Sequence, residues 1–327
     1  MAELFDNVKF EKPSGEFGDE VVARLSDRVR AKTFVVTGAS PDSLALAAVH
    51  SLVKGGAGRI FLLGRSHGKI QAAIDSLGKV DTELVPIIAD LDSIKSVQQG
   101  SEEIAAKSQD SAIDYVLASA GIMATPWQLT QDGIESQFGV CHVAHFVLTK
   151  VLLQAAQKAH RTAPRFSYVS STGYHGGNFR GDDYNFKQGA EYHPWVAYGQ
   201  AKSANIILAR ELARQKAGVL AYSVDPGMVK TRLARSLSKE TMIAFGFADE
   251  NGVPKSTGTS TFGLEFSTHE RAAGQMLYSL LDPSLEAQNG AFISNGRVLA
   301  VDAAQTEEGL SQKLWQVSED IVSRALQ

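Results

Sequence analysis

Three polar residues in the second half of the chain, Ser171, Tyr198 and Lys202, could together transfer a proton. Tyr198 and Lys202 are four residues apart in the stretch YGQAK, so on a helix they lie on the same face. A tyrosine hydroxyl ionises near pH ~10, but a neighbouring ammonium group favours the phenolate and lowers the pKa. Such a tyrosine can exchange a proton with an oxygen atom while a hydride moves at the attached carbon. The same spacing also arises by chance in surface tyrosines that stack on lysines, so the context of the motif must decide.

Ser171 ends the apolar stretch RFSYVSS (165–171), which predicts a buried strand. At the carboxyl end of a strand its hydroxyl could hydrogen-bond a substrate oxygen, although serines also end strands for purely local reasons. Ser171 precedes Tyr198 and Lys202, strand–helix units come before all three, and the stretch DPG (225–227) follows. This order favours one shared site at the carboxyl ends of neighbouring strands.

Apolar and amphipathic stretches alternate along most of the chain. Continuous apolar stretches predict strands at 33–38, 59–65, 83–91, 112–121, 165–171, 220–227 and near 291. Helical spacing of apolar residues predicts helices at 19–30, 43–56, 68–79, 93–108, 132–160, 197–215 and 307–326. Buried strands that alternate with helices are typical of a parallel sheet covered on both faces. We therefore predict an α/β fold with a Rossmann-type, doubly wound parallel sheet.

The domain organisation follows from the same pattern. No linker, internal repeat or low-complexity segment interrupts the alternation, so we predict a single domain over 31–327 after an N-terminal arm and helix at 1–30. Two segments, 172–195 and 228–265, do not fit the alternation of strands and helices, and both follow predicted strands. Ligands of doubly wound sheets bind outside the carboxyl ends of the strands, so these insertions are predicted to be substrate loops.

Composition narrows the class of protein. The net charge of -4 shows no basic excess for binding nucleic acid or an anionic membrane. The one cysteine, Cys141, excludes an internal disulfide and fits a cytoplasmic location. No run of 18 apolar residues predicts a membrane span, and no metal site is expected, because His142 and His145 lack further ligands nearby in the sequence. These two histidines are interpreted as packing or solvent-facing residues.

The stretch VVTGASPDSLALAA (35–48) begins like a dinucleotide-binding turn and then departs from the pattern. Glycines are expected at the positions of Asp42 and Leu44, where one lets the backbone approach a pyrophosphate and the other lets the helix pack on the strand. The amides at a helix N-terminus can hold a phosphate without every glycine. We therefore expect dinucleotide binding to survive, either weakened or with a shifted loop.

From Thr33 to Gly227 the chain resembles the short-chain dehydrogenase/reductase family. The resemblance is carried by TGAS, ADL, SAGIM, VSS, YGQAK and DPGMVKT, each after a predicted strand or at the start of a helix. The stretches GIESQFGV, DDYNF and WVAYGQAKSANI are similar to the retinol-dehydrogenase-like branch, which includes many fungal members.

The resemblance implies roles for the residues that match. Tyr198 would be the catalytic acid/base, Lys202 would lower its pKa and hold the nicotinamide ribose, and Ser171 would orient the reacting oxygen. The implied cofactor-binding residues are Gly38, Ser40, Ser43, Leu44, Arg65, Asp90, Leu91, Ala118, Gly121, Tyr198, Lys202, Pro226, Gly227, Val229 and Thr231. A guanidinium pairs bidentately with phosphate, so Arg65 favours NADP(H) over NAD(H).

Two further positions depart from the family pattern. Cys141 stands where an asparagine usually supports the lysine through water, and a thiol is a weaker hydrogen-bond partner. It is either a buried helix cysteine or a reactive thiol near the substrate. Ala118 and Ser119 stand where two asparagines often precede the Ala-Gly pair.

The residues and the resemblance together predict an NADP(H)-dependent oxidoreductase that interconverts a ketone or aldehyde and an alcohol on a lipophilic small molecule. Secondary metabolism is the expected setting. A homo-oligomer could form through the helices 132–160 and 197–215, unless the inserted segments block them. Two alternatives remain: a non-redox enzyme that catalyses isomerisation, dehydration or cyclisation, and a nucleotide-sensing binding protein.

Overall fold

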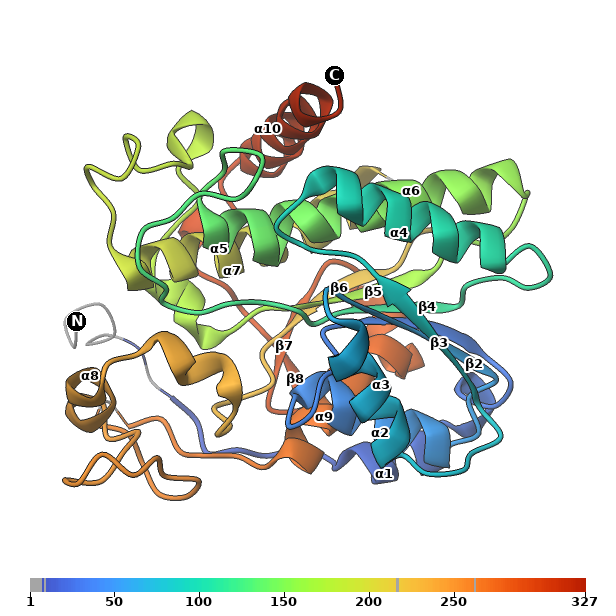
Figure 1. The fold of residues 1–327 in the computed structure, drawn as a ribbon, viewed down its shortest axis with the longest axis horizontal. Helices are drawn as coiled ribbons and strands as arrows, with labels where there is room; N and C mark the ends of the chain where they lie inside the picture. The colour runs from blue at the N-terminus through green and yellow to red at the C-terminus, as the bar shows by residue number, and fades with distance from the viewer. Residues whose placement is uncertain (1–7, 9, 216–217, 262) are drawn as a thin grey trace.

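The computed structural model describes residues 8, 10–215, 218–261 and 263–327. These residues form an eight-stranded sheet in the order β3-β2-β1-β4-β5-β6-β7-β8 (Figure 1). The strands are β1 (Thr33–Thr37), β2 (Arg59–Gly64), β3 (Glu83–Ile88), β4 (Tyr115–Ala118), β5 (Arg165–Val169), β6 (Ala221–Val224), β7 (Phe292–Ser294) and β8 (Arg297–Leu299). The strands β1 to β7 are parallel, and β8 pairs antiparallel with β7. The strand order reverses between β1 and β4, as in a doubly wound fold, so the predicted fold class is confirmed.

Helices cover both faces of the sheet in two layers. One layer holds α1 (Gly18–Arg24), α2 (Leu44–Lys54), α3 (His67–Ser76) and α9 (His269–Leu281). The other holds α4 (Ile94–Lys107), α6 (Ala144–Lys158), α7 (Pro194–Gln215) and α10 (Leu310–Ala325), as Figure 1 shows. This double cover explains why the strands are apolar without alternation.

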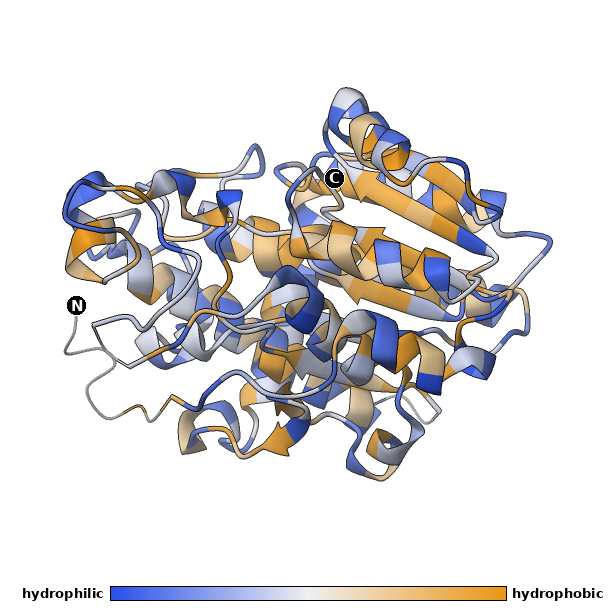
Figure 2. Cartoon of the chain, turned by 90° about the horizontal axis from the view of Figure 1, so that it is seen from below, coloured by the Kyte–Doolittle hydropathy of each residue, from blue (hydrophilic) through white to orange (hydrophobic). Residues whose placement is uncertain are grey.

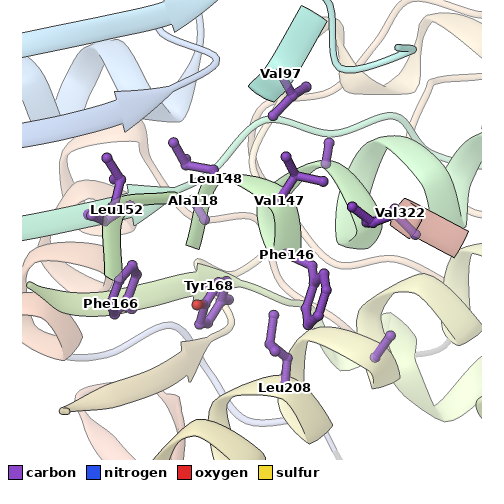
Figure 3. Close-up of a cluster of buried hydrophobic side chains, with 14 of the residues drawn as sticks. Val97, Ala118, Phe146, Val147, Leu148, Leu152, Phe166, Tyr168, Leu208 and Val322 are labelled. Atoms are coloured by element: carbon purple, nitrogen blue, oxygen red, sulfur yellow. The ribbon is translucent and has the colours of Figure 1, made fainter. Parts of the chain in front are cut away.

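The core consists of two clusters, one on each face of the sheet. Successive strand residues alternate between them, since Val35 contributes to one cluster and Val36 to the other. Phe146, Phe166, Tyr168 and others pack between α6 and the sheet in the first cluster (Figure 3). Figure 2 shows the hydrophobic strands enclosed by helices whose outer residues are hydrophilic.

The long helix predicted at 132–160 is interrupted. The chain forms a short helix, α5 (Ser136–Phe138), a π-helical turn at Gly139–Val143, and then α6. The carboxylate of Glu135 accepts hydrogen bonds from the amides of Gln137 and Phe138, so the helix begins there rather than at 132. Single π-helical turns inside helices often occur at functional sites, and this one contains Cys141.

Four other elements differ from the prediction. The N-terminal helix ends at Arg24 and is followed by a single 3₁₀ turn at Ser26–Arg28. The helix α9 was not predicted from the sequence, although Ala273, Met276, Leu277 and Leu280 form a buried apolar stripe along it. A Cβ at position 274 would collide with the carbonyl oxygen of Glu16, so glycine lets the N-terminal arm cross this helix. The strand β8 and α8 (Lys239–Ala244), inside the segment 228–265, were also not predicted.

The N-terminal arm is attached to the far edge of the sheet. The amide of Ser14 donates to Asn295 Oδ1, and Glu11 pairs with Arg297. Residues 1–7 and 9 of the predicted arm lie outside the described residues.

One helical stretch of the described chain, Ser136–Lys158, is long and apolar enough to cross a membrane. No such span was predicted from the sequence. In its most apolar window, 67% of the residues are buried inside the protein, as in the core helix of a globular domain.

Candidate active site

The structure brings Ser171, Tyr198 and Lys202 together. Ser171 follows β5, while Tyr198 and Lys202 lie on the same face of α7, and a Cβ at Gly173 would lie within 3.2 Å of both Oγ of Ser171 and the ring of Tyr198. The Ser171 hydroxyl also accepts the amide of Gly173 at 3.0 Å. A Cβ at position 173 would lie 2.7 Å from Cε1 of Tyr198, so glycine lets this turn lie against the tyrosine ring.

Burial dominates the electrostatics of this group. It raises the pKa of Tyr198 despite the opposing effect of the Ser171 hydroxyl, and it lowers the pKa of Lys202. The ammonium of Lys202 lies 5.5 Å from the centre of the Tyr198 ring and donates to the carbonyl oxygen of Val169 at 3.0 Å. The sequence predicted a lowered pKa for Tyr198, and the structure gives the opposite direction. At neutral pH Tyr198 therefore holds its proton, as a proton donor must.

The turn between β1 and α2 has the geometry of a phosphate cradle. Gly38 has φ +80°, and a Cβ there would lie 2.8 Å from Cα of Ala120. The hydroxyl of Ser43 accepts the amides of Ser40 and Leu46, so it caps α2.

Two amides at the start of α2, those of Leu44 and Ala45, have no hydrogen-bond partner among the described residues. Unpaired amides at a helix N-terminus attract anions. These residues therefore fit the pyrophosphate of a dinucleotide.

Asp42 does not block this cradle. It adopts φ +61°, the left-handed conformation in which a glycine is usually found, so the turn survives the substitution. Its side chain is 69% exposed and forms an ion pair with Arg232 at 3.4 Å. Arg232 belongs to the segment that follows β6, so this ion pair joins that segment to the turn between β1 and α2.

The remaining residues predicted to bind the cofactor line the same edge of the sheet. Arg65 follows β2 and is exposed, with no ion-pair partner among the described residues. Asp90 and Leu91 follow β3 and are partly buried. Ala118 ends β4, and a Cβ at Gly121 would lie 3.2 Å from the sulfur of Cys141 and 3.7 Å from Nζ of Lys202.

The segment after β6 completes this edge of the sheet. Pro226, Gly227 and Val229 follow the strand, and Gly227 has φ +84°. The hydroxyl of Thr231 accepts the amide of Leu233 and so begins a 3₁₀ turn. The predicted cofactor-binding positions other than Tyr198 and Lys202, which lie on α7, therefore follow the carboxyl ends of the strands.

A buried network that the sequence did not reveal joins the β1 turn to the π-helical turn. The hydroxyl of Thr37 accepts the amides of Ser119 and Ala120, each at 2.9 Å, so its own hydrogen points to Nε2 of His145 at 2.9 Å. Nδ1 of His145 then donates to the carbonyl oxygen of Cys141 at 2.9 Å. Burial lowers the pKa of His145 to about 4, so the ring is neutral.

The two histidines are buried, which confirms packing and excludes the solvent-facing interpretation. His142 bonds to the hydroxyl of Ser318 at 2.9 Å. No group of three or more potential metal ligands occurs in the described part of the chain. Two histidines on an apolar helix are usually packing residues, so only the polarity of Thr37 at the end of β1 could have pointed to the network.

Cys141 is fully buried, and its sulfur lies 3.5 Å from both the amide nitrogen and the carbonyl oxygen of Ile122. Burial raises the pKa of its thiol, which disfavours a reactive thiolate. The geometry therefore favours the buried helix cysteine over the reactive thiol.

An apolar cluster covers Tyr198. It contains Ala124, Trp195, Tyr198 and Phe245, with Met123, Leu237 and Phe247 packed against it. The ring of Trp195 lies 6.0 Å from Tyr198 and 5.4 Å from Phe245, measured between ring centres. Both inserted segments therefore contribute apolar side chains next to the reactive hydroxyl.

Three other aromatic residues of the segment 172–195, namely Tyr174, Phe179 and Tyr192, contact other parts of the protein. Tyr174 packs on Phe292, and Phe179 belongs to the core. The hydroxyl of Tyr192 donates to the carbonyl oxygen of Thr125 at 2.8 Å.

The histidines of this insertion also have partners of their own. His175 pairs with Asp302 at 2.7 Å, and Nδ1 of His193 lies 3.4 Å from the amide of Val196. Among Tyr174, Phe179, Tyr192 and Trp195, the ring contact with Tyr198 is made by Trp195.

Comparison with known proteins identifies the family. The sequence model described as short chain dehydrogenase matches residues 32–171. Retinol dehydrogenase 13 of Homo sapiens is 30% identical over 301 residues, covering 89% of this chain and 84% of that protein. Retinol dehydrogenase 14 of Homo sapiens is 30% identical over 243 residues, covering 73% of this chain and 67% of that protein.

The chain therefore belongs to the short-chain dehydrogenase family, whose members are oxidoreductases of alcohols and carbonyl compounds that use a nicotinamide dinucleotide. Within the family it is retinol-dehydrogenase-like.

Solved structures share the fold. An uncharacterized protein from Mycobacterium Paratuberculosis has a TM-score of 0.69 at 25% identity, covering 95% of this chain and 98% of that one. The NADPH bound carbonyl reductase from chicken fatty liver has a TM-score of 0.56 at 19% identity, covering 83% of this chain and all of that one. At that identity the second likeness is one of fold alone.

Proposed function

We propose that this chain is an NADP(H)-dependent oxidoreductase that interconverts a ketone or aldehyde and an alcohol on a lipophilic small molecule. The observation that carries the proposal is that Ser171, Tyr198 and buried Lys202 lie together at the edge of the sheet that bears the phosphate cradle.

The residues divide the chemistry as follows. A bound nicotinamide would supply or accept the hydride. In the reducing direction, the hydroxyls of Ser171 and Tyr198 hold the carbonyl oxygen of the substrate. As the carbonyl carbon is reduced, the proton of the Tyr198 hydroxyl passes to that oxygen, and the positive charge of Lys202 stabilises the phenolate that forms. Because burial raises the pKa of Tyr198, its hydroxyl carries the proton that the reducing direction requires.

The preference for NADP(H) over NAD(H) rests on Arg65. Its guanidinium is exposed at the carboxyl end of β2, where a dinucleotide of this fold carries its adenosine ribose. Two structural neighbours are described as NADPH complexes, the carbonyl reductase from chicken fatty liver and a blue fluorescent protein from a metagenomic library, which supports the same preference.

The lipophilic substrate is proposed from the apolar cluster of Trp195, Phe245 and their neighbours beside Tyr198. The names of the retinol dehydrogenases among the relatives agree with it. We place the enzyme in the cytoplasm and in secondary metabolism, and the single cysteine supports the first of these.

Fluorescence titration with NADPH and NADH tests the cofactor, and NADPH oxidation over a panel of lipophilic carbonyl compounds tests the reaction. We expect micromolar binding of NADPH, with NADH at least ~10-fold weaker. We expect Tyr198→Phe to lower kcat at least ~100-fold with the affinity for NADPH unchanged. Tyr278→Phe, in α9 on the other face of the sheet, is the matched control and should keep full activity.

Two results would contradict the proposal. Failure to bind either dinucleotide would remove the redox function. A product of the same mass as the substrate, or changed only by water, with no NADPH consumed, would instead favour the isomerase or dehydratase alternative.

A further inference from the structure

The buried ring of His145 has no part in the proton and hydride transfer described above. His145 lies in α6 and is 1% exposed. Its Nε2 lies 2.9 Å from the hydroxyl oxygen of Thr37, at the end of β1. Its Nδ1 lies 2.9 Å from the carbonyl oxygen of Cys141, in the π-helical turn. The ring therefore joins two elements that border the candidate site.

The partners of His145 fix the direction of every hydrogen bond in this network. A carbonyl oxygen only accepts, so Nδ1 carries the hydrogen and Nε2 of the neutral ring accepts. The hydroxyl of Thr37 therefore donates to Nε2, while its oxygen accepts the amides of Ser119 and Ala120. A hydroxyl has one hydrogen and two lone pairs, so the whole capacity of Thr37 is used. A fully satisfied buried network holds its members in one geometry.

The two partners of His145 hold the same short segment, 119–122, which we call the β4 turn. On one side, the Thr37 hydroxyl accepts the first two amides of this turn, each at 2.9 Å. On the other side, the sulfur of Cys141 lies 3.5 Å from both the amide nitrogen and the carbonyl oxygen of Ile122. Because His145 bonds to both partners, it fixes the two ends of the β4 turn relative to each other.

The β4 turn lies between the phosphate cradle and Lys202. A Cβ at Gly38 in the cradle would lie 2.8 Å from Cα of Ala120. A Cβ at Gly121 would lie 3.7 Å from Nζ of Lys202. The backbone of the turn thus contacts both groups, and a shift of the turn would change the shape of the cradle and the surroundings of the ammonium.

We propose that His145 is a positioning residue that fixes the β4 turn between the phosphate cradle and Lys202 through its hydrogen bonds to Thr37 and Cys141. This inference rests on the proposed function, because the cradle is assigned to the dinucleotide and Lys202 to the proton transfer. The bond to Thr37 acts on the side of the cradle, and the bond to Cys141 acts on the side of the ammonium. Variants that keep one bond each should therefore affect different steps.

His145→Asn keeps the bond to Cys141 and loses the bond to Thr37. The amide nitrogen of asparagine can take the place of Nδ1 and donate to the carbonyl oxygen, but the side chain is too short to replace Nε2. This variant should raise the dissociation constant of NADPH about fivefold, with kcat at saturating NADPH within about twofold of the wild type.

His145→Gln keeps the other bond. The amide oxygen of glutamine can take the place of Nε2 and accept from the Thr37 hydroxyl, while the carbonyl oxygen of Cys141 loses its donor. This variant should lower kcat about fivefold, with the dissociation constant of NADPH within about twofold of the wild type. The proposal fails if the two variants change both constants in the same proportion.

Thr149→Val is the matched control for the loss of a buried hydrogen bond in α6. The hydroxyl of Thr149 lies 2.7 Å from both the carbonyl oxygen of His145 and the hydroxyl of Tyr168, and neither partner belongs to the β4 turn. This variant should lower the melting temperature and leave both NADPH affinity and kcat unchanged. If the His145 variants change these constants no more than the control does, the ring has a structural role only and the proposal is overturned.

Thr37 provides the same test if the His145 variants do not fold. Thr37→Val removes the hydroxyl and should raise the dissociation constant of NADPH about fivefold. Thr37→Ser keeps the hydroxyl, so it should bind NADPH within about twofold of the wild type. Equal affinities in the two variants would overturn the proposal, because the network depends on this hydroxyl.

Two measurements without substrate separate failure of this inference from failure of the proposed function. If the wild-type protein binds no NADPH or turns over no carbonyl compound, the proposed function falls. Nitrogen-15 spectra at neutral pH should still show His145 with a hydrogen on Nδ1 and none on Nε2. Amide exchange at 119–122 should still be faster in His145→Asn or Thr37→Val than in the wild type, with 59–64 as the unchanged reference. The opposite tautomer, or equal exchange, would overturn the positioning role on its own.

Discussion

Cys141 shows how one residue can weaken a site without removing it. Its sulfur contacts the backbone of Ile122 and lies next to Gly121, in front of Lys202. A thiol forms much weaker hydrogen bonds than an amide, so the connection from the ammonium to the π-helical turn is poor at this position.

Cys141→Asn should therefore raise kcat for carbonyl reduction, by about two- to fivefold, because the amide side chain can support Lys202 directly or through water. Cys141→Ala is the control, since it removes the thiol without adding an amide and should give no gain. Steady-state kinetics at saturating NADPH measures both variants. An asparagine variant no faster than the alanine variant would show that the thiol does not limit the reaction.

Glu135 makes the stability of the fold depend on pH. Burial raises the pKa of its carboxyl to about 7, from an ordinary value of 4.5, although the amides of Gln137 and Phe138 favour its ionised form. Because the folded protein then binds the proton more tightly than the unfolded chain, this group stabilises the fold at low pH. The contribution is lost as the pH rises from about 4.5 through about 7.

Glu135→Gln should remove this pH dependence and keep one acceptor oxygen, although the two amides donate to different oxygens of the carboxylate. Relative to the wild type, we expect the variant to gain about 3 kcal/mol in free energy of unfolding between pH 4.5 and pH 8. Urea unfolding at pH 5, 6, 7 and 8 measures the difference. Parallel curves for the two proteins would contradict this assignment.

At the scale of elements, the turn between β1 and α2 keeps its function with an altered sequence. Asp42 takes the backbone conformation of the missing glycine, and Arg232 pairs with its carboxylate. Both side chains are largely exposed, so the ion pair itself contributes little to stability. We expect the ion pair to affect cofactor binding instead. Asp42 neutralises the charge of Arg232 and places its own negative charge near the phosphate cradle.

Asp42→Gly should tighten NADPH binding about three- to tenfold, and the gain should shrink at high salt. Asp42→Asn separates charge from backbone strain, because asparagine tolerates the left-handed conformation without carrying the charge. Fluorescence titrations at ~50 mM and ~500 mM salt measure both variants. Affinities that match the wild type in both would show that this charge does not reach the cofactor.

The local pattern of apolar residues in the sequence was enough to predict most helices and strands, but not the contacts between them. The strands β1 to β7 were predicted because parallel strands buried on both faces are continuously apolar. The interruption of the helix at 136–143 was not predicted, because it depends on the hydrogen bonds that the Glu135 carboxylate accepts from the amides of Gln137 and Phe138.

The candidate site divides in the same way. Ser171, Tyr198 and Lys202 were predicted from spacing and order, because these residues lie on adjacent elements. His145 was missed, because it acquires its role from Thr37, which is 108 residues away in β1.

At the scale of the molecule, α10 lies across the helices through which an oligomer was considered. Trp315 packs edge-on against Phe146 of α6 at 4.9 Å, and Glu319 pairs with Lys150. The same helix packs on α7 and contributes Ile321 to the core. α10 thus covers part of the faces of α6 and α7 within one chain.

We therefore expect a monomer of 35.1 kDa in size-exclusion chromatography with light scattering, at protein concentrations up to ~100 μM. Ile321→Ala should lower the free energy of unfolding by about 2–5 kcal/mol, because it opens a cavity under α10. A stable species of twice the monomer mass would show that a surface other than the one beneath α10 mediates pairing.

The two edges of the sheet bear on aggregation. The edge strand β3 contains Pro86, which has no amide hydrogen to offer to an incoming strand. The opposite edge strand, β8, is three residues long and lies beside the charged pair of Glu11 and Arg297. Within the described residues, neither edge presents a long run of free backbone donors and acceptors, so one copy of the chain is a poor template for cross-β growth of another.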